Sequence, residues 1–313
     1  MADFQLTTPV AFLIFNRPDT TARVFEAIRQ AKPPKLLVVA DGPRPDRADD
    51  IEKCKASRAI IEGVDWDCEV LKNYSGVNLG CKKRVSSGLD WVFEIVEEAI
   101  ILEDDCLPHP TFFRYCEELL KYYRSDTRIM HINGTNHGLT DENCQDSYRF
   151  SKLTNIWGWA AWRRSWQYYD VKMSVWSELM NQDRLLKDLF KSKQELKTRK
   201  KNWDLVYSNK IDTWDYQWLL ACICQGGLTI MPRENLIANI GFGVEATHTK
   251  DETNKFANLP IYPIEFPLIH PKFMLRDIYS DHLIFRHIYK KNLRKNILQK
   301  LKNVLKSYVD NKR

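Results

Sequence analysis

An apolar run that leads into three consecutive carboxylates is the strongest constraint on the fold of this 313-residue chain. Residues 99–102 read Ala-Ile-Ile-Leu and are followed directly by Glu103, Asp104 and Asp105, with Pro108 shortly after. The run predicts a buried strand of a parallel sheet, which Pro108 should end. Open α/β sheets place their ligands at the carboxyl ends of strands. Because adjacent carboxylates repel one another, the cluster predicts a cation site, the alternative being a solvated acidic turn.

Two strands and a helix are predicted near the amino terminus. Apolar residues over 9–15 and 36–40 indicate strands, and the segment between them indicates a helix through residue 30, with Asp19 or Thr20 as its N-cap. A strand, a helix and a strand in this order predict a parallel βαβ unit.

Four charged residues are predicted near the same edge of the sheet. Arg17 and Asp41 follow the first two strands, where either turn chemistry or contacts to a base and a phosphate would account for them. A helix predicted over 82–98 opens with basic residues, including Lys83 and Arg84, which oppose the helix dipole. A docked anion would explain this placement, and a solvated basic face is the alternative.

Aromatic residues are concentrated in the second half of the chain. Residues 157–162 are rich in Trp and predict a strand, and the charged stretch 176–203 predicts a helical excursion. The next helix should begin at Asp212 or Thr213 as N-cap, which puts Asp215 in its first turn. Further elements are expected over 68–71, 110–123, 129–133 and 228–232.

The positive charge of the chain belongs to its carboxyl terminus. The formal net charge is +6, but residues 286–313 contain ten Lys/Arg and one acid, so the preceding 285 residues carry −3. Apolar residues recur at helical spacing over 289–308, which predicts a basic amphipathic helix on an anionic membrane surface, or else a helix packed on the body. Basic residues confined to one segment, with no recognition motif, argue against nucleic-acid binding.

The cysteines and the hydropathy pattern bear on localisation. None of the eight cysteines forms a CxxC pair or a Cys/His zinc spacing, and no apolar stretch is long enough to span a membrane. No amino-terminal signal pattern is present. We therefore expect a cytoplasmic protein, peripheral on the inner face of the membrane, with reduced thiols.

Taken in order, these residues resemble GT-A fold glycosyltransferases, most closely the group related to N-acetylglucosaminyltransferase I. The resemblance covers residues 8–250 and departs from the family pattern at Tyr216, where the family has a second acid. Four segments carry it: Phe15-Asn16-Arg17 with Ala40-Asp41-Gly42, Asn78-Leu79-Gly80 with Arg84, Ile101–Asp105 with Pro110–Phe113, and Gly158-Trp159 with Trp214–Trp218.

The resemblance implies an α/β fold of the GT-A, Rossmann-like type: a mixed, mostly parallel central sheet flanked by helices. The helical spacing over 289–308 adds a carboxyl-terminal helical tail. The resemblance also implies a nucleotide-sugar-binding half over 1–110 and an acceptor-side half over 111–265. Charge and helical spacing, rather than the resemblance, indicate a basic amphipathic tail over 266–313.

The resemblance also implies the roles of particular residues. Asp105 would bind Mn²⁺ or Mg²⁺, and Asp215 would be the catalytic base. The donor-binding residues would be Arg17, Asp41, Lys83, Arg84, Glu103 and Asp104. Further candidates are His248 and the aromatic residues Trp157, Trp159, Trp162 and Trp214, which could stack on a sugar.

The activity implied is metal-dependent, inverting transfer of a sugar from a nucleotide-sugar donor, expected to be a UDP-sugar, to a hydroxyl of a glycan or lipid-linked acceptor. Two alternatives remain open: a nucleotidyltransferase that makes sugar nucleotides, and a non-catalytic protein that binds glycans or a membrane surface.

Overall fold

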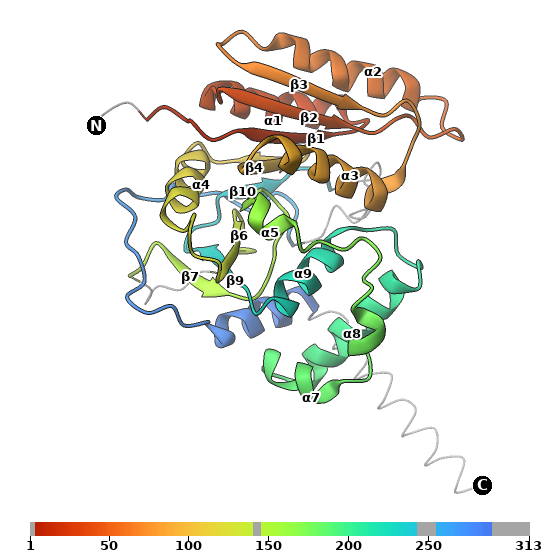
Figure 1. The fold of residues 1–313 in the computed structure, drawn as a ribbon. Coiled ribbons are helices and arrows are strands. Elements are labelled where there is room, and N and C mark those ends of the chain that lie inside the picture. Colours follow the sequence, from red (N-terminus) through yellow and green to blue (C-terminus); the bar gives the residue numbers. More distant parts are fainter. Residues whose placement is uncertain (1–3, 140–144, 243–254, 290–313) are drawn as a thin grey trace, which may run out of the picture.

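The computed structural model describes residues 4–139, 145–242 and 255–289 (Figure 1). Its centre is a sheet of eight strands in the order β3-β2-β1-β4-β8-β6-β9-β7. In that order the strands are β3 (Glu69–Tyr74), β2 (Lys35–Ala40), β1 (Val10–Ile14), β4 (Glu98–Glu103), β8 (Trp159–Trp162), β6 (Ile129–Asn133), β9 (Leu228–Pro232) and β7 (Tyr148–Ser151).

Six of these strands run in one direction. The pairs β3–β2, β2–β1, β1–β4 and β6–β9 are parallel, whereas β8 is antiparallel to β4 and β6, and β7 is antiparallel to β9. All five residues of β1 are buried, as expected for a strand covered on both faces. The predicted fold class, α/β with a mixed, mostly parallel central sheet flanked by helices, is confirmed.

Helices cover both faces of the sheet. On one face, α1 (Pro18–Ala31) and α4 (Thr111–Tyr122) pack in a core with Phe12 and Val38. On the other face, α3 (Gly80–Ile95), α5 (Arg163–Trp166) and α9 (Asp215–Cys224) pack in a core with the intervening strand residues. Beyond α1 lies α2 (Asp50–Ile60), followed by the 3₁₀ turn η1 (Ile61–Gly63).

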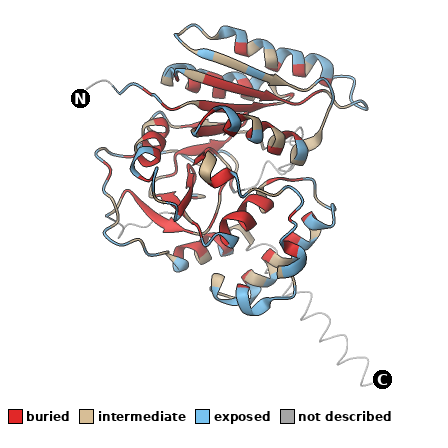
Figure 2. Cartoon of the chain, in the orientation of Figure 1, coloured by how far each residue is buried: buried red, intermediate tan, exposed pale blue. Residues whose placement is uncertain are grey.

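The predicted helical excursion over 176–203 is several helices rather than one. It consists of α6 (Trp176–Leu179), α7 (Asp183–Leu186), the 3₁₀ turn η2 (Lys187–Leu189) and α8 (Lys193–Tyr207). The chain restarts at Ser192, whose hydroxyl accepts a hydrogen bond from the Glu195 amide and caps α8. These helices bury Trp176 and Trp203 in a separate core against α9, so the stretch is not solvated all round (Figure 2).

Two predictions about element ends are wrong. Pro108 is not what ends the strand over 99–102, because β4 already ends at Glu103; Pro108 instead ends β5 (Cys106–Pro108), which pairs with β10 (Ile237–Asn239) in a second, two-stranded sheet. The N-cap of α1 is Arg17 rather than Asp19 or Thr20, since Pro18 already occupies the first helical position.

The segment that follows residue 265 packs on the body as far as the structure describes it. The buried Asp281 carboxylate accepts hydrogen bonds from the Ser151 hydroxyl, the Lys152 amide and the Arg276 guanidinium. The basic stretch 290–313 lies outside the described residues, so its membrane role stays a prediction. Among the helices that the structure describes, none is long and apolar enough to cross a membrane.

The contact between α3 and β2 gives a test of this packing. A Cβ on Gly88 would lie 2.4 Å from Cγ1 of Val39, so Gly88→Ala should force α3 off the sheet. We expect a loss of about 1–3 kcal/mol in unfolding free energy, the usual cost of overpacking, measured by denaturant unfolding. Gly76→Ala is the control, because nothing lies within 4 Å of a Cβ there; equal stability of the two variants would contradict the packing.

Candidate functional site

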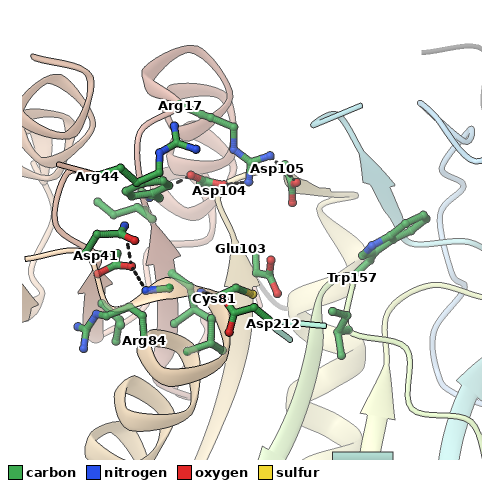
Figure 3. Close-up of a pocket in the computed structure, with 18 of the residues that line it drawn as sticks. Arg17, Asp41, Arg44, Cys81, Arg84, Glu103, Asp104, Asp105, Trp157 and Asp212 are labelled. Carbon is green, nitrogen blue, oxygen red and sulfur yellow. Dashed lines mark hydrogen bonds and ion pairs between the residues drawn. The ribbon is translucent and has the colours of Figure 1, made fainter. Parts of the chain in front are cut away.

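A cavity of about 350 Å³ opens at the carboxyl ends of β1, β2 and β4 (Figure 3). The first turn of α3 and the loops that precede β8 and α9 complete its wall. The charged and polar residues that line it are Arg17, Asp41, Arg44, Asn78, Arg84, Glu103, Asp104, Asp105, Asp212 and Asn239. The sheet edge predicted to hold a ligand is thus the one that carries this cavity.

Arg17 holds two of the three carboxylates. Its guanidinium donates from Nη1 to Oδ2 of Asp105 over 2.8 Å and from Nη2 to Oδ1 of Asp104. The amide of Phe15 donates to the other oxygen of Asp104, over 3.1 Å. Burial lowers the pKa of Arg17, but the charges of and hydrogen bonds to Asp104 and Asp105 raise it by more, so the net effect is a raised pKa. Burial raises the pKa of Asp104 despite the neighbouring guanidinium.

Glu103 differs from its two neighbours. Its Oε1 is buried and has no hydrogen-bond partner among the described residues. Burial, followed by the charges of Asp105 and Asp104, raises the pKa of Glu103 well above 4.5. An orphaned buried carboxylate oxygen is costly unless a cation or a donor satisfies it.

The carboxylates fit a divalent cation by their chemistry. Mn²⁺ and Mg²⁺ favour carboxylate oxygens, and the unpartnered oxygen of Glu103 belongs to the same cavity lining as Asp105, whose side chain is 10% exposed. Within the described residues, no three His, Cys, Asp or Glu side chains already converge as metal ligands. Two of the three carboxylates of the cluster, those of Asp104 and Asp105, are paired with Arg17 instead.

The carboxylate of Asp41 is hydrogen-bonded mainly to backbone amides of the protein itself. It accepts hydrogen bonds from the amides of Gly42, Leu79 and Gly80 and from the side chain of Asn78, at 2.9–3.1 Å. Burial raises its pKa although these amides oppose the shift. Asp41 therefore fixes the loop between β3 and α3 at the cavity.

The two basic residues of α3 that are predicted to bind the donor, Arg84 and Lys83, lie in different environments. Arg84 is buried and donates to the carbonyls of Ala40 and Asn73, so it ties together the ends of β2 and β3. Lys83 is exposed and does not line the cavity.

The anion at the start of α3 is a side chain of this protein. The carboxylate of Asp212 accepts hydrogen bonds from the amides of Cys81 (3.0 Å) and Lys82 (3.4 Å), and Lys82 Nζ donates to Asn209 over 2.6 Å. Both Cys81 and Asp212 line the cavity (Figure 3). Asp212 is thus a residue of the cavity wall rather than the N-cap of α9. That position belongs to Trp214, without a side-chain cap, so the predicted cap at Asp212 or Thr213 is wrong.

Asp215 lies close to the cavity but is not among the described residues that line it. It is the first residue of α9, half-buried, and accepts a hydrogen bond from the Thr213 hydroxyl. Its charge contributes to raising the pKa values of Glu103 and Cys81. The structure therefore brings the Asp215 carboxylate close enough to Glu103 for its charge to act there.

Of the predicted aromatic residues, only Trp157 lines the cavity among those the structure describes. Trp159, Trp162 and Trp214 are at most 2% exposed; Trp159 stacks on Trp214 at 5.7 Å between ring centroids. Gly158 adopts a left-handed φ of +56°, which breaks the strand pattern between Trp157 and Trp159. His248 lies outside the described residues.

Sequence reasoning did not assign a site role to Arg44. Its guanidinium lies over the Phe15 ring at 5.4 Å and is held by the buried Asp50 carboxylate. The only sequence signal is the position of Arg44 after Asp41-Gly42-Pro43.

No protein-family model and no curated protein matches this sequence. Among solved structures, the chain is similar to a mannosyltransferase, PcManGT from Pyrobaculum calidifontis, in complex with GDP-Man and Mn²⁺, at 13% identity and a TM-score of 0.35. That match covers 50% of this chain but only 45% of the mannosyltransferase.

Two further solved structures are similar at the same low level. The galactosyltransferase LgtC, in complex with donor and acceptor sugar analogues, matches 81% of this chain and 85% of its own, at 13% identity and a TM-score of 0.36. A UDP-glucose pyrophosphorylase complexed with UDP-glucose matches 48% and 59%, at 11% identity and a TM-score of 0.25. Likenesses of this size assign neither a family nor a function.

The unpartnered carboxylate of Glu103 predicts a pH-dependent effect of Glu103→Gln in metal-free protein. A carboxyl whose pKa is raised on folding favours the native state below its unfolded pKa, near 4.5, and costs stability as the pH rises through its folded pKa. Gln carries no such penalty, so the variant should gain stability over the wild type at pH 7 and lose that advantage near pH 4. Chemical denaturation at both pH values measures this.

Glu94→Gln is the control, because Glu94 is exposed on α3 and should show no such difference. A Glu103→Gln variant less stable than the wild type at pH 7 would contradict the interpretation of Glu103 as an unsatisfied buried acid.

Proposed function

We propose that this protein is a metal-dependent, inverting glycosyltransferase. It takes a sugar from a nucleotide-sugar donor, most simply a UDP-sugar, and transfers it to a hydroxyl of a glycan or lipid-linked acceptor. The observation that carries the proposal is the orphaned Glu103 oxygen beside Asp104 and Asp105, inside a cavity at the carboxyl ends of parallel strands.

The cavity has the parts that such a donor requires. A nucleoside diphosphate joined to a sugar needs a charged region for its phosphates and flat or polar surfaces at its two ends. The carboxylate cluster and Arg17 form the charged region, the Phe15–Arg44 pair offers a flat surface at one side, and Trp157 offers another (Figure 3).

Asp105 and Glu103 would hold Mn²⁺ or Mg²⁺, as the donor set and the unpartnered Glu103 oxygen suggest. The bound cation supplies Lewis-acid stabilisation of the departing diphosphate. Arg17, fixed by Asp104 and Asp105, adds a preorganised positive charge near the same groups.

Asp215 is the proposed base. The acceptor oxygen forms a bond to the anomeric carbon as the bond from that carbon to the diphosphate oxygen breaks, and the hydroxyl proton passes to the Asp215 carboxylate. Attack from the face opposite the leaving group inverts the anomeric carbon. The place of Asp215 at the start of α9, with its charge close enough to raise the pKa of Glu103, supports this role.

Asp105→Ala should abolish metal-dependent donor binding. In the wild type, a UDP-sugar at 100 times its Kd with Mn²⁺ should stabilise the fold by about 2.7 kcal/mol, seen as a rise in Tm. The variant should show no such rise because it lacks the proposed ligand.

Asp188→Ala, which removes an exposed carboxylate outside the cavity, is the matched control and should respond like the wild type. Donor-induced stabilisation that is the same with and without Mn²⁺ in wild type would argue against metal dependence. A screen of nucleotide sugars in the same assay identifies the donor.

Asp215→Asn should retain donor binding and lose turnover by about 10²–10⁴, the usual contribution of a positioned base. Measuring the donor Kd by calorimetry and kcat with a glycan acceptor separates the two effects. Asp90→Asn is a control for general perturbation of this region, because the Asp90 carboxylate on α3 is exposed and accepts a hydrogen bond from Trp166 Nε1. Transfer at the wild-type rate by Asp215→Asn would remove Asp215 from the mechanism.

A further inference from the structure

A short stretch near the described carboxyl end exposes several large apolar side chains. Between residues 269 and 279, Phe273 is 65% exposed, Leu275 74% and Tyr279 57%, with Ile269 and Ile278 also exposed. We call these five residues the carboxyl-terminal apolar patch. Five large apolar side chains exposed within eleven residues are more than the single exposed apolar residues that are normal on a protein surface, and such a concentration is a candidate interaction site.

The backbone beneath the patch is held firmly. Arg276 donates to the buried Asp281 carboxylate over 2.7 Å and to the Leu189 carbonyl over 2.6 Å. The amide of Asp277 donates to the Phe150 carbonyl of β7 over 2.8 Å, and Leu268 is buried. The apolar side chains therefore face outward from an anchored segment rather than from a loose end.

Exposed cations accompany the patch. Lys272 Nζ lies 5.5 Å from the centre of the Phe273 ring, and Lys191 Nζ lies 4.3 Å from the centre of the Tyr279 ring. The acids of this segment are engaged: Asp281 is buried, and Asp277 lies 4.0 Å from the Arg149 guanidinium. The surface thus combines apolar groups with available positive charge.

We propose that the carboxyl-terminal apolar patch docks on an anionic lipid surface. Apolar side chains with flanking lysines are the combination that binds at the interface of an anionic bilayer. A second copy of this chain fits less well, because two-fold pairing of the patch would bring the lysines of one copy toward those of the other. The patch leads into the +9 segment 286–313, whose charge has the sign that the same surface attracts.

The proposal is independent of the proposed enzymatic function, since it rests on described residues away from the donor cavity. In Figure 1 the blue helix over 278–289 lies in the lower half of the molecule, below β7 and β9, whereas α2 lies at the top. This separation provides a control surface on the same protein.

Sedimentation of the full-length protein with vesicles tests the proposal. Vesicles of phosphatidylcholine with phosphatidylglycerol should bind the wild type, and vesicles of phosphatidylcholine alone should bind it weakly. Phe273→Ser with Leu275→Ser should lower the partition constant about tenfold or more, because two large apolar side chains no longer enter the interface. Lys191→Gln with Lys272→Gln should lower the partition constant about fivefold for each lysine. The decrease should be smaller at high salt, which screens the attraction between the lysines and the lipid.

Ile51→Ser is the matched control. Ile51 is an exposed apolar residue of α2, 59% accessible, and its replacement should leave vesicle binding unchanged. Both serine variants change exposed positions, and circular dichroism with thermal melts should show wild-type folding.

Three outcomes would overturn the proposal. One is vesicle binding by the Phe273→Ser, Leu275→Ser variant equal to that of the wild type, which would assign all membrane affinity to residues 290–313. Another is no binding of the wild type to anionic vesicles. The third is a wild-type dimer in analytical ultracentrifugation that the same serine variant abolishes, which would assign the patch to a second copy.

Discussion

The contact of Arg17 with Asp104 and Asp105 is the interaction on which the rest of the site depends. Arg17 follows β1 and the aspartates follow β4, and the parallel pairing of these strands places Leu13 opposite Glu103. Burial of two adjacent carboxylates is tolerable because the guanidinium is beside them. Removing one partner of a buried pair costs about 3–5 kcal/mol. The shape of the cavity therefore depends on the ion pairs, and the ion pairs depend on the register between β1 and β4.

The first half of the fold was predictable because its strands are continuous apolar runs bounded by charged or turn residues. β1, β2 and β4 and the carboxylate cluster at the sheet edge follow from that pattern. The three-residue strands β5 and β10 could not be predicted in this way. They are defined by their pairing with each other, and so short a strand has no local sequence pattern. The division of 176–203 into separate helices likewise follows from the burial of Trp176 and Trp203 against α9.

The roles of single charged residues were less predictable than their positions. Asp41 and Arg84 were placed at the sheet edge, yet much of their hydrogen-bonding capacity serves backbone groups of the surrounding loops. A sequence shows that such a residue is charged. It does not show whether the side chain forms its hydrogen bonds with the backbone or with a ligand. Asp212 shows the converse, because its contact with Cys81 joins positions 131 residues apart and no local pattern contains it.

That contact also determines how the cavity can change its width. The hydrogen bonds from Cys81 and Lys82 to Asp212, and from Lys82 to Asn209, act as a strap between α3 and the chain just before α9. The central sheet fixes the floor of the cavity, but this strap fixes the distance between two of its walls. Opening the cavity on this side means breaking a few solvent-exposed hydrogen bonds, while the floor stays unchanged.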